Sequence, residues 1–171
     1  MPRYVAFLRG VSPMNAKMPE LKSCFENAGF GAVKTLLSSG NVAFDARAGS
    51  EAALARRIEA AMAKNLDRTF RTIVRSSIAL RELIEADPYA AFRLPANAKR
   101  VVTFLRAPLA SPPALPAEVR GARILKIGAE EIFTAYVPQA GNPVFMNLIE
   151  KTFGTELTTR TWETVKKCAA A

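Results

Sequence analysis

The chain has 171 residues, with 24 Lys and Arg against 15 Asp and Glu, no His, two Cys and 50% apolar residues. That length suits one domain or two small ones with a real core, and the apolar fraction excludes a disordered chain. No stretch approaches the roughly 18 apolar residues of a membrane helix, and Arg9 ends the first apolar run too early for a signal peptide. Cys24 and Cys168 are too few for a disulfide framework, so we expect a cytoplasmic protein without membrane contact.

The lack of histidine narrows the possible chemistry. It excludes Ser-His and Cys-His nucleophile pairs, because their general base is missing, and two Cys alone cannot complete a zinc site. No Walker loop and no G-x-G-x-x-G motif occurs, so no metal and no cofactor is predicted. Acid–base chemistry by carboxylates, Lys, Tyr or Cys remains open, as does charge stabilisation by Arg or Lys.

The formal net charge is +9, and no basic tail or run of like charges carries it. A charge of this size attracts polyanions through counterion release. Two interpretations follow. The charge either keeps an ordinary mixed surface soluble, or it serves the binding of nucleic acid or of a phosphorylated ligand.

The first half of the chain predicts six alternating elements. Residues 3–9 form a strand that is apolar on both faces, and a helix over 19–28 begins with Pro19 and ends at Gly29. Further elements are a hairpin of 33–37 and 42–44, a helix from Ser50 to about Leu66, and a strand over 70–75. The order strand–helix–strand–strand–helix–strand predicts a ferredoxin-like plait over residues 1–76.

The second half reads as a degenerate copy of the first. Ser76 and Ser77 begin a helix to Ala86, within a linking segment over 77–98. Residues 99–171 then predict strands over 101–105, 122–127, 132–137 and 155–158, with helices over 146–153 and 161–170. The Pro-rich stretch 107–119 predicts a short helical turn at most.

The predicted fold class is therefore α+β, with two ferredoxin-like halves packed together and the second degenerate. Strands 3–9 and 132–137 are apolar on both faces, so they need more cover than their own helices give. That cover comes either from the other half of the chain or from a second copy, which leaves monomer and homodimer both open.

Several short motifs stand along the chain, the most specific of them near its two ends: Tyr4–Gly10, Met18, Ala28–Phe30, Val33–Thr35, Ser39–Val42 and Thr158–Val165. Together they resemble a bacterial family known only as domain of unknown function sixteen-ninety-seven. The resemblance implies a cytosolic protein of two ferredoxin-like halves with no established activity. The family's loop after the first Arg-Gly is usually Gly-rich, whereas here it is Val11–Asn15, which weakens a backbone cradle for an anion. Lys17 stands where the family favours a basic residue.

Six residues are candidate ligand contacts: Arg9, Lys17, Ser39, Asn41, Arg160 and Trp162. Arg9 ends a central strand. Its guanidinium is equally suited to binding a ligand's phosphate or carboxylate through two hydrogen bonds and to pairing with a nearby acidic side chain of the protein. Ser39 and Asn41 flank Gly40, and a tight turn is the favoured interpretation there. Arg160 with Trp162 could bind a ligand, but Thr161 as a helix cap and Trp162 in the core is favoured.

Three further side chains are not counted among the candidate ligand contacts. Tyr4 is the only ring placed to stack on an RNA base, and the motif of RNA-recognition domains is absent. Cys24 is expected to be a buried, inert thiol, and Cys168 an exposed one near the terminus.

The function that these residues favour is non-catalytic binding of an anionic ligand, with Arg9, Lys17 and Arg160 converging in one cleft. The ligand class is a phosphorylated metabolite or nucleic acid. A His-independent enzyme using carboxylate or Lys/Arg chemistry is the alternative, and a protein-interaction module is another.

Overall fold

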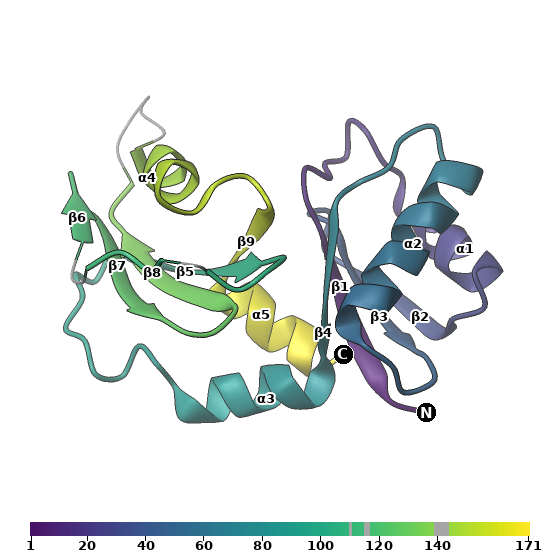
Figure 1. Ribbon diagram of the computed structural model, residues 1–171, viewed down its shortest axis with the longest axis horizontal. Helices are drawn as coiled ribbons and strands as arrows, with labels where there is room; N and C mark the ends of the chain where they lie inside the picture. The colour runs from purple at the N-terminus through teal and green to yellow at the C-terminus, as the bar shows by residue number, and fades with distance from the viewer. Residues whose placement is uncertain (110, 115–116, 139–143) are drawn as a thin grey trace. The chain divides into compact units, whose positions relative to one another are not determined.

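The computed structural model describes residues 1–109, 111–114, 117–138 and 144–171. It is a mixed α+β protein whose described residues form five helices and two antiparallel sheets (Figure 1). The chain divides into two compact units. The first comprises Met1–Leu83 and Lys166–Ala171, and the second comprises Ile84–Val165.

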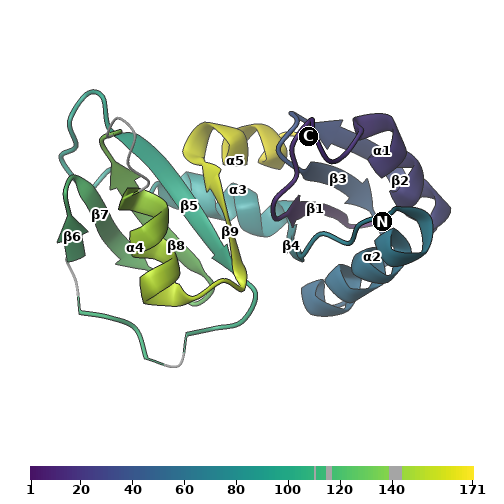
Figure 2. The ribbon, with the colours of Figure 1, turned by 90° about the horizontal axis from the view of Figure 1, so that it is seen from above.

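The first unit contains a four-stranded sheet in the order β2-β3-β1-β4, with every neighbouring pair antiparallel. Helices α1 and α2 lie on the same face of this sheet (Figure 2). Its elements are β1 (Arg3–Leu8), α1 (Met18–Asn27), β2 (Gly31–Leu36), β3 (Asn41–Asp45), α2 (Glu51–Asn65), β4 (Thr72–Ser76) and the first part of α3 (Ser77–Ala86). The strands and helices agree with those predicted to within a few residues.

The second unit contains a five-stranded sheet in the order β6-β7-β8-β5-β9. Helix α4 packs on one face of it, where Phe145 and Ile149 join the unit's apolar core. The elements are β5 (Lys99–Leu105), β6 (Ala117–Val119), β7 (Ala122–Ile127), β8 (Glu131–Tyr136), α4 (Val144–Phe153), β9 (Leu157–Thr161) and most of α5 (Trp162–Ala169).

Strand β6 corrects the prediction for the Pro-rich stretch 107–119, of which residues 110 and 115–116 lie outside the described residues. The stretch ends in a strand, and no helical turn occurs among its described residues. Val119 pairs with Ala122 across a two-residue turn, in which Arg120 and Gly121 both have positive φ. Such turns match the twist of a hairpin, but they usually contain Asn-Gly or Asp-Gly, so the dipeptide Arg120-Gly121 gave only a weak signal.

The core of the first unit lies between the sheet and its two helices. Phe44 on β3 packs against Phe25 of α1 at 5.6 Å and against Phe30 at 4.7 Å between ring centroids. Leu54, Ile58 and Met62 are buried along one stripe of α2, because their four-residue spacing places them on one face of the helix. Ser50 caps that helix by accepting a hydrogen bond from the amide of Ala53 at 3.0 Å.

The two faces of β1 are both buried. Tyr4, Ala6 and Leu8 belong to the core beneath the helices, and Tyr4 stacks on Phe44 at 5.8 Å. Val5 and Phe7 point to the opposite face and are 0% exposed. The strand is thus covered on both sides, as its apolar alternation predicted.

Cys168 is buried, which corrects the prediction that it is exposed. Val165, Cys168 and Ala169 follow the three- and four-residue spacing of one helix face, and all three are buried. The end of the chain is also held in place, because the Arg3 guanidinium donates to the carbonyl of Ala171 at 2.8 Å. A cysteine close to a terminus is therefore not at a frayed end here.

Candidate functional site

Two loops come together at one end of the first sheet. Strand β1 ends at Leu8 and β4 begins at Thr72, and these two residues face each other in the antiparallel pair. The loop 9–17 after β1 and the loop 66–71 before β4 are consequently neighbours. The amide of Arg9 donates to the carbonyl of Arg71 at 2.8 Å, which ties the loops together.

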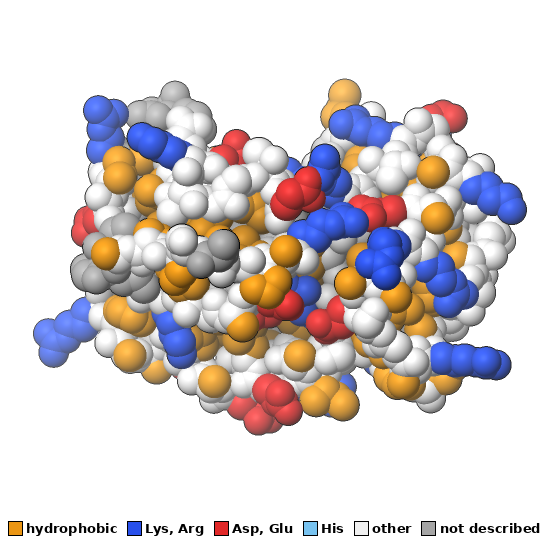
Figure 3. All heavy atoms as spheres, in the orientation of Figure 1, with side chains coloured by type: hydrophobic (Ala, Val, Ile, Leu, Met, Phe, Trp, Pro, Cys, Tyr) orange, Lys and Arg blue, Asp and Glu red, His pale blue; other side chains and the backbone are white. Residues whose placement is uncertain are grey.

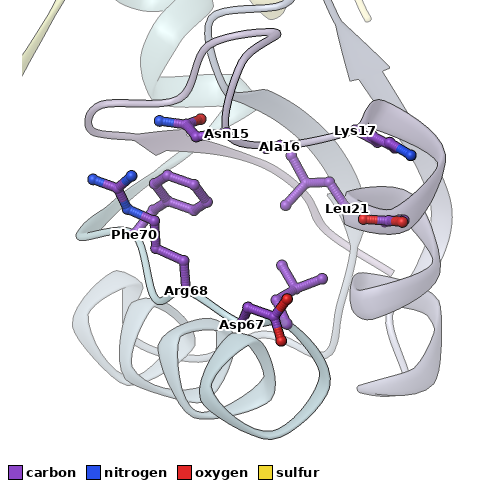
Figure 4. Close-up of a pocket in the computed structure, with 9 residues that line it drawn as sticks. Asn15, Ala16, Lys17, Leu21, Asp67, Arg68 and Phe70 are labelled. Carbon is purple, nitrogen blue, oxygen red and sulfur yellow. The ribbon is translucent and has the colours of Figure 1, made fainter.

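A hollow of about 80 Å³ lies between these loops and the first turn of α1 (Figure 4). Leu21 and Phe70 give it an apolar wall, and both side chains are buried. Charged side chains of both signs surround the opening, and all of them are exposed. The residues that line the hollow are Asn15, Ala16, Lys17, Glu20, Leu21, Leu66, Asp67, Arg68 and Phe70.

Lys17 occupies the N-cap position of α1, directly at the hollow. Its backbone is extended, with φ −99° and ψ 131°, as a capping residue requires, but no side-chain cap bond forms there among the described residues. A lysine cannot accept the hydrogen bond that Ser, Thr, Asp or Asn would accept, and its charge opposes the positive end of the helix dipole. The start of α1 thus combines a cation with helix amides that no side chain caps.

Arg68 lies on the opposite side of the hollow from Lys17 (Figure 4). Its guanidinium is 5.4 Å from the centroid of the Phe70 ring, a distance at which a cation and an aromatic face attract each other. The ring therefore holds the guanidinium beside the hollow. Two cations from separate loops flank one small space.

The backbone of the loop 10–16 is occupied with its own hydrogen bonds. The Asn15 side chain donates to the carbonyl of Gly10 at 2.8 Å and accepts from the amide of Ser12 at 2.9 Å. The amides of Asn15 and Ala16 both donate to the carbonyl of Ser12. The amides of Ser12, Asn15 and Ala16 are therefore engaged within the loop. That a loop without the family's glycines is a poor backbone cradle for an anion stays a prediction.

A second, wider hollow of about 510 Å³ continues from the first between α1 and the end of α2. Glu20, Leu66 and Asp67 line both hollows. The side chains that line only the second are mainly polar and uncharged: Ser23, Asn27 and Asn65, together with Pro19 and Cys24.

Cys24 is 2% exposed, as predicted for an inert thiol. Burial raises the pKa of the Cys24 thiol above its ordinary value, and a hydrogen bond with the Asn65 side chain lowers it by less. A raised thiol pKa keeps the sulfur protonated and unreactive at neutral pH.

Four of the six candidate residues lie in the first unit. Arg9 and Lys17 are in the loop 9–17 that follows β1. Ser39 and Asn41 belong to the β2–β3 hairpin, whose turn lies at the same end of the sheet. The Asn41 side chain donates to Ser39 Oγ at 2.9 Å and to the carbonyl of Leu36 at 3.1 Å. These bonds close the turn, the interpretation that the sequence favoured, and a ligand contact by either residue stays a prediction.

The other two candidates, Arg160 and Trp162, lie in the second unit. The Arg160 guanidinium donates to Thr158 Oγ1 and to the carbonyl of Thr159, both at 2.7 Å. Trp162 is 5% exposed and meets the Tyr89 ring edge-on at 5.2 Å. Thr161 accepts from the amide of Thr164 at 3.3 Å, so it caps α5 as favoured. The convergence of Arg160 with Arg9 and Lys17 in one cleft stays a prediction.

Three charged residues of the hollow were not singled out from the sequence: Glu20, Asp67 and Arg68. Asp67 and Arg68 are about 50 positions from Lys17, and only the pairing of β4 with β1 makes their loops neighbours. Of these positions, only Lys17 gave a usable signal. A helix with Pro in its first turn usually has Ser, Thr, Asp or Asn at the N-cap, and here the N-cap residue is a lysine.

The described residues hold no helix long and apolar enough to cross a membrane. In the same part of the chain, no group of three or more Cys, Asp or Glu residues is arranged to hold a metal ion.

The fold and the hollow define a mixed α+β protein with two antiparallel sheets and a charged recess beside a helix start. Residues 1–133 match the family model described as "Protein of unknown function (DUF1697)", and the chain belongs to this family. The solved structure of the conserved bacterial protein SP0830 from Streptococcus pneumoniae is similar in fold, with a TM-score of 0.75 at 20% sequence identity. The alignment covers 99% of this chain and 97% of that one. A search of curated proteins gave no match.

Proposed function

We propose that this protein binds a small phosphorylated metabolite in the hollow at the start of α1, without transforming it. The observation that carries the proposal is Lys17 at the N-cap of α1, facing Arg68 across the hollow. Helix starts bind phosphate because their amides point at the anion and the dipole favours negative charge. A lysine at the N-cap lowers the stability of the ligand-free protein, because its charge is repelled by the positive end of the helix dipole. A bound anion would offset that repulsion.

A small ligand fits the surroundings better than a nucleic acid. The first hollow has room for a phosphate group and little more. On the face in Figure 3, basic side chains are mixed with acidic and apolar ones instead of forming a continuous track. Tyr4, the candidate ring for stacking on a base, is buried against Phe44. Salt-dependent retention on an immobilised oligonucleotide would instead favour nucleic acid, because phosphate contacts release counterions.

Binding also fits the hollow better than catalysis. A general acid or base usually works from a site where burial tunes its pKa. Both carboxylates at the hollow, those of Glu20 and Asp67, belong to exposed residues. Among the described residues that line this hollow, no buried acid stands beside the cations to support the enzyme alternative.

The proposal is tested with pyrophosphate as the probe, titrated into the ¹⁵N-labelled full chain and followed by NMR. We expect the amide signals of Met18 and Glu20 to move most, since these are the first N–H groups of α1 and Pro19 has none. Lys17→Gln and Arg68→Gln should each weaken binding about tenfold, the scale of one charge-assisted hydrogen bond.

The matched control is Arg56→Gln, which removes the same charge from an exposed position on α2 in the same unit. Arg56 lies ten positions before Leu66, so the rise of α2 places it about 15 Å from the end of the helix at the hollow. If Arg56→Gln weakens pyrophosphate binding as much as Lys17→Gln, the attraction is only that of net charge. Absence of any shift at Met18 and Glu20 would contradict the proposal directly.

We also propose that both units are ferredoxin-like plaits. The order β2-β3-β1-β4 in the first unit is matched by β7-β8-β5-β9 in the second, with β6 in the chain position where the first unit has α1. An experimental structure with a different strand order in either sheet would contradict this. Cytoplasmic residence is part of the same proposal and is supported by two buried free thiols, Cys24 and Cys168, which suit a reducing compartment.

A further inference from the structure

The carboxylates around the two hollows are not explained by the binding of a simple anion. Glu20 and Asp67 line the first hollow together with Lys17 and Arg68. No ion pair joins these four side chains among the described residues. For phosphate alone, two carboxylates at the opening would be repulsive neighbours.

The charges follow an order along the groove that the two hollows form. The cations line the first hollow only, the two carboxylates line both, and the amides of Asn27 and Asn65 line the second only. The carboxylates therefore lie at the junction of the hollows. A ligand whose anionic group occupies the first hollow would place its next few atoms beside Glu20 and Asp67.

From this order we infer that the ligand carries an ammonium group a few atoms from its phosphate, so that the site recognises a phosphorylated amine. The phosphate lies at Lys17, Arg68 and the start of α1. The ammonium group lies between Glu20 and Asp67, and any further polar part of the ligand lies against Ser23, Asn27 and Asn65. This inference rests on the proposed function and names the chemical class of its ligand.

The test compares two probes that differ only in the ammonium group, O-phosphoethanolamine and ethyl phosphate. Titration calorimetry with the full chain should give binding of O-phosphoethanolamine that is tighter by about fivefold, the scale of one solvent-exposed ion pair. In the double variant Glu20→Gln with Asp67→Asn, the two probes should bind equally, and ethyl phosphate should bind at least as tightly as before because two repulsive charges are gone.

The control is Glu26→Gln, which removes an exposed carboxylate of α1 that lines neither hollow; it should keep the preference for O-phosphoethanolamine. Equal binding of both probes by the unmodified chain overturns the ammonium site and leaves the phosphate site intact. A preference that survives the double variant overturns it as well. If neither probe binds, the proposed function fails together with this inference.

Discussion

The two units differ in the helices and aromatic contacts that cover one face of their sheets. In the first unit α1 and α2 lie on one face of the sheet, and an aromatic cluster of Phe25, Phe30 and Phe44 fills the space between. In the second unit α4 packs against β7, and the stacked rings of Tyr136 and Phe145, 4.5 Å apart, are the corresponding contact. The first unit has helix α1 between β1 and β2, whereas strand β6 comes between β5 and β7 in the second unit. The hollow lies at the start of α1.

In the first unit, α2 also contacts one edge of the sheet. Strand β4 is an edge strand, yet α2 occupies two of its amides: Glu59 accepts from Thr72 at 3.1 Å, and Glu51 accepts from Ser76 at 2.7 Å. Unpaired strand edges invite pairing with other chains. In the first unit, α2 therefore both fills the core and covers an edge.

The largest expected effect comes from removing a core side chain in each unit. Phe44→Ala should destabilise the first unit by about 3–5 kcal/mol, and Ile149→Ala the second by about 2–5 kcal/mol, since both side chains are fully buried. Trp162, the chain's one tryptophan, lies in the second unit, so its fluorescence reports on that unit while circular dichroism reports on both. Urea unfolding of Phe44→Ala should shift the circular dichroism transition and leave the fluorescence transition in place, whereas Ile149→Ala should shift the fluorescence transition together with the second unit's share of the circular dichroism signal. Coincident shifts of both signals for both variants would contradict separate cores.

Two glycines with the same backbone conformation provide a closer comparison. Gly40 in the first unit has φ +86° and Gly154 in the second has φ +85°. A Cβ at Gly40 would lie 2.9 Å from Val11 Cβ and 3.0 Å from the carbonyl of Leu8, whereas at Gly154 it would meet nothing within 4 Å. Gly154→Ala should therefore cost about 1 kcal/mol, from the left-handed conformation alone. Gly40→Ala should cost about 2–4 kcal/mol, because overpacking adds to that strain.

If thermal or urea unfolding shows that Gly40→Ala and Gly154→Ala lose the same stability, Val11 can move away from a Cβ at position 40 at little energetic cost. In that case the tight contact between the hairpin and the loop after β1 would not set the geometry of the sheet end.

Most elements of the first unit were predictable because their signals are local. Ser50 as a cap, the stripe of α2 and the turn at Gly40 each lie within a few residues of the structure they specify. Strand β6 was missed because Arg120 is an unusual residue for a turn with positive φ. The burial of Cys168 was missed because proximity to the terminus outweighed the spacing of Val165, Cys168 and Ala169.

The hollow was predictable only in part. Lys17 stood out from its family position, but its neighbours Asp67 and Arg68 are brought to it by strand order. Strand order depends on which β-strands pair, and no local pattern in the loop 66–71 encodes that pairing. The grouping of Glu20 with Lys17, Asp67 and Arg68 is likewise a property of the assembled groove.

A smaller effect with opposite sign is expected at the start of α1. Lys17→Ser should stabilise the first unit by about 1 kcal/mol, because serine can cap a helix whose N-cap backbone is already extended. The same change should abolish the pyrophosphate-induced shifts at Met18 and Glu20, since it removes a cation and occupies a helix amide. Lys17→Ala, which removes the cation without adding a cap, should weaken binding without the gain in stability. A serine variant that is more stable and still binds as before would separate the uncapped start of α1 from function.

The smallest effect concerns alkaline pH and differs between the units. Burial raises the pKa of the Cys24 thiol in the first unit and, more strongly, that of the Tyr89 hydroxyl in the second; Tyr89 also donates to the carbonyl of Val101 at 2.8 Å. A group with a raised pKa in the folded state favours folding only while it stays protonated. Its contribution therefore declines as pH rises past the ordinary value, which is 9.0 for the thiol and 10.0 for the hydroxyl.

Urea unfolding between about pH 8 and about pH 11 should consequently show the first unit losing stability at lower pH than the second, by at most about 1.4 kcal/mol per pH unit for each group. Cys24→Ala should remove the earlier decline from the circular dichroism signal, and Tyr89→Phe should remove the later decline from Trp162 fluorescence. Each variant serves as the other's control, because each group lies in a different unit. If Tyr89→Phe leaves the fluorescence profile unchanged, the hydroxyl is already free to ionise in the folded chain, and the second unit's interior is more accessible to water than the 3% exposure of Tyr89 indicates.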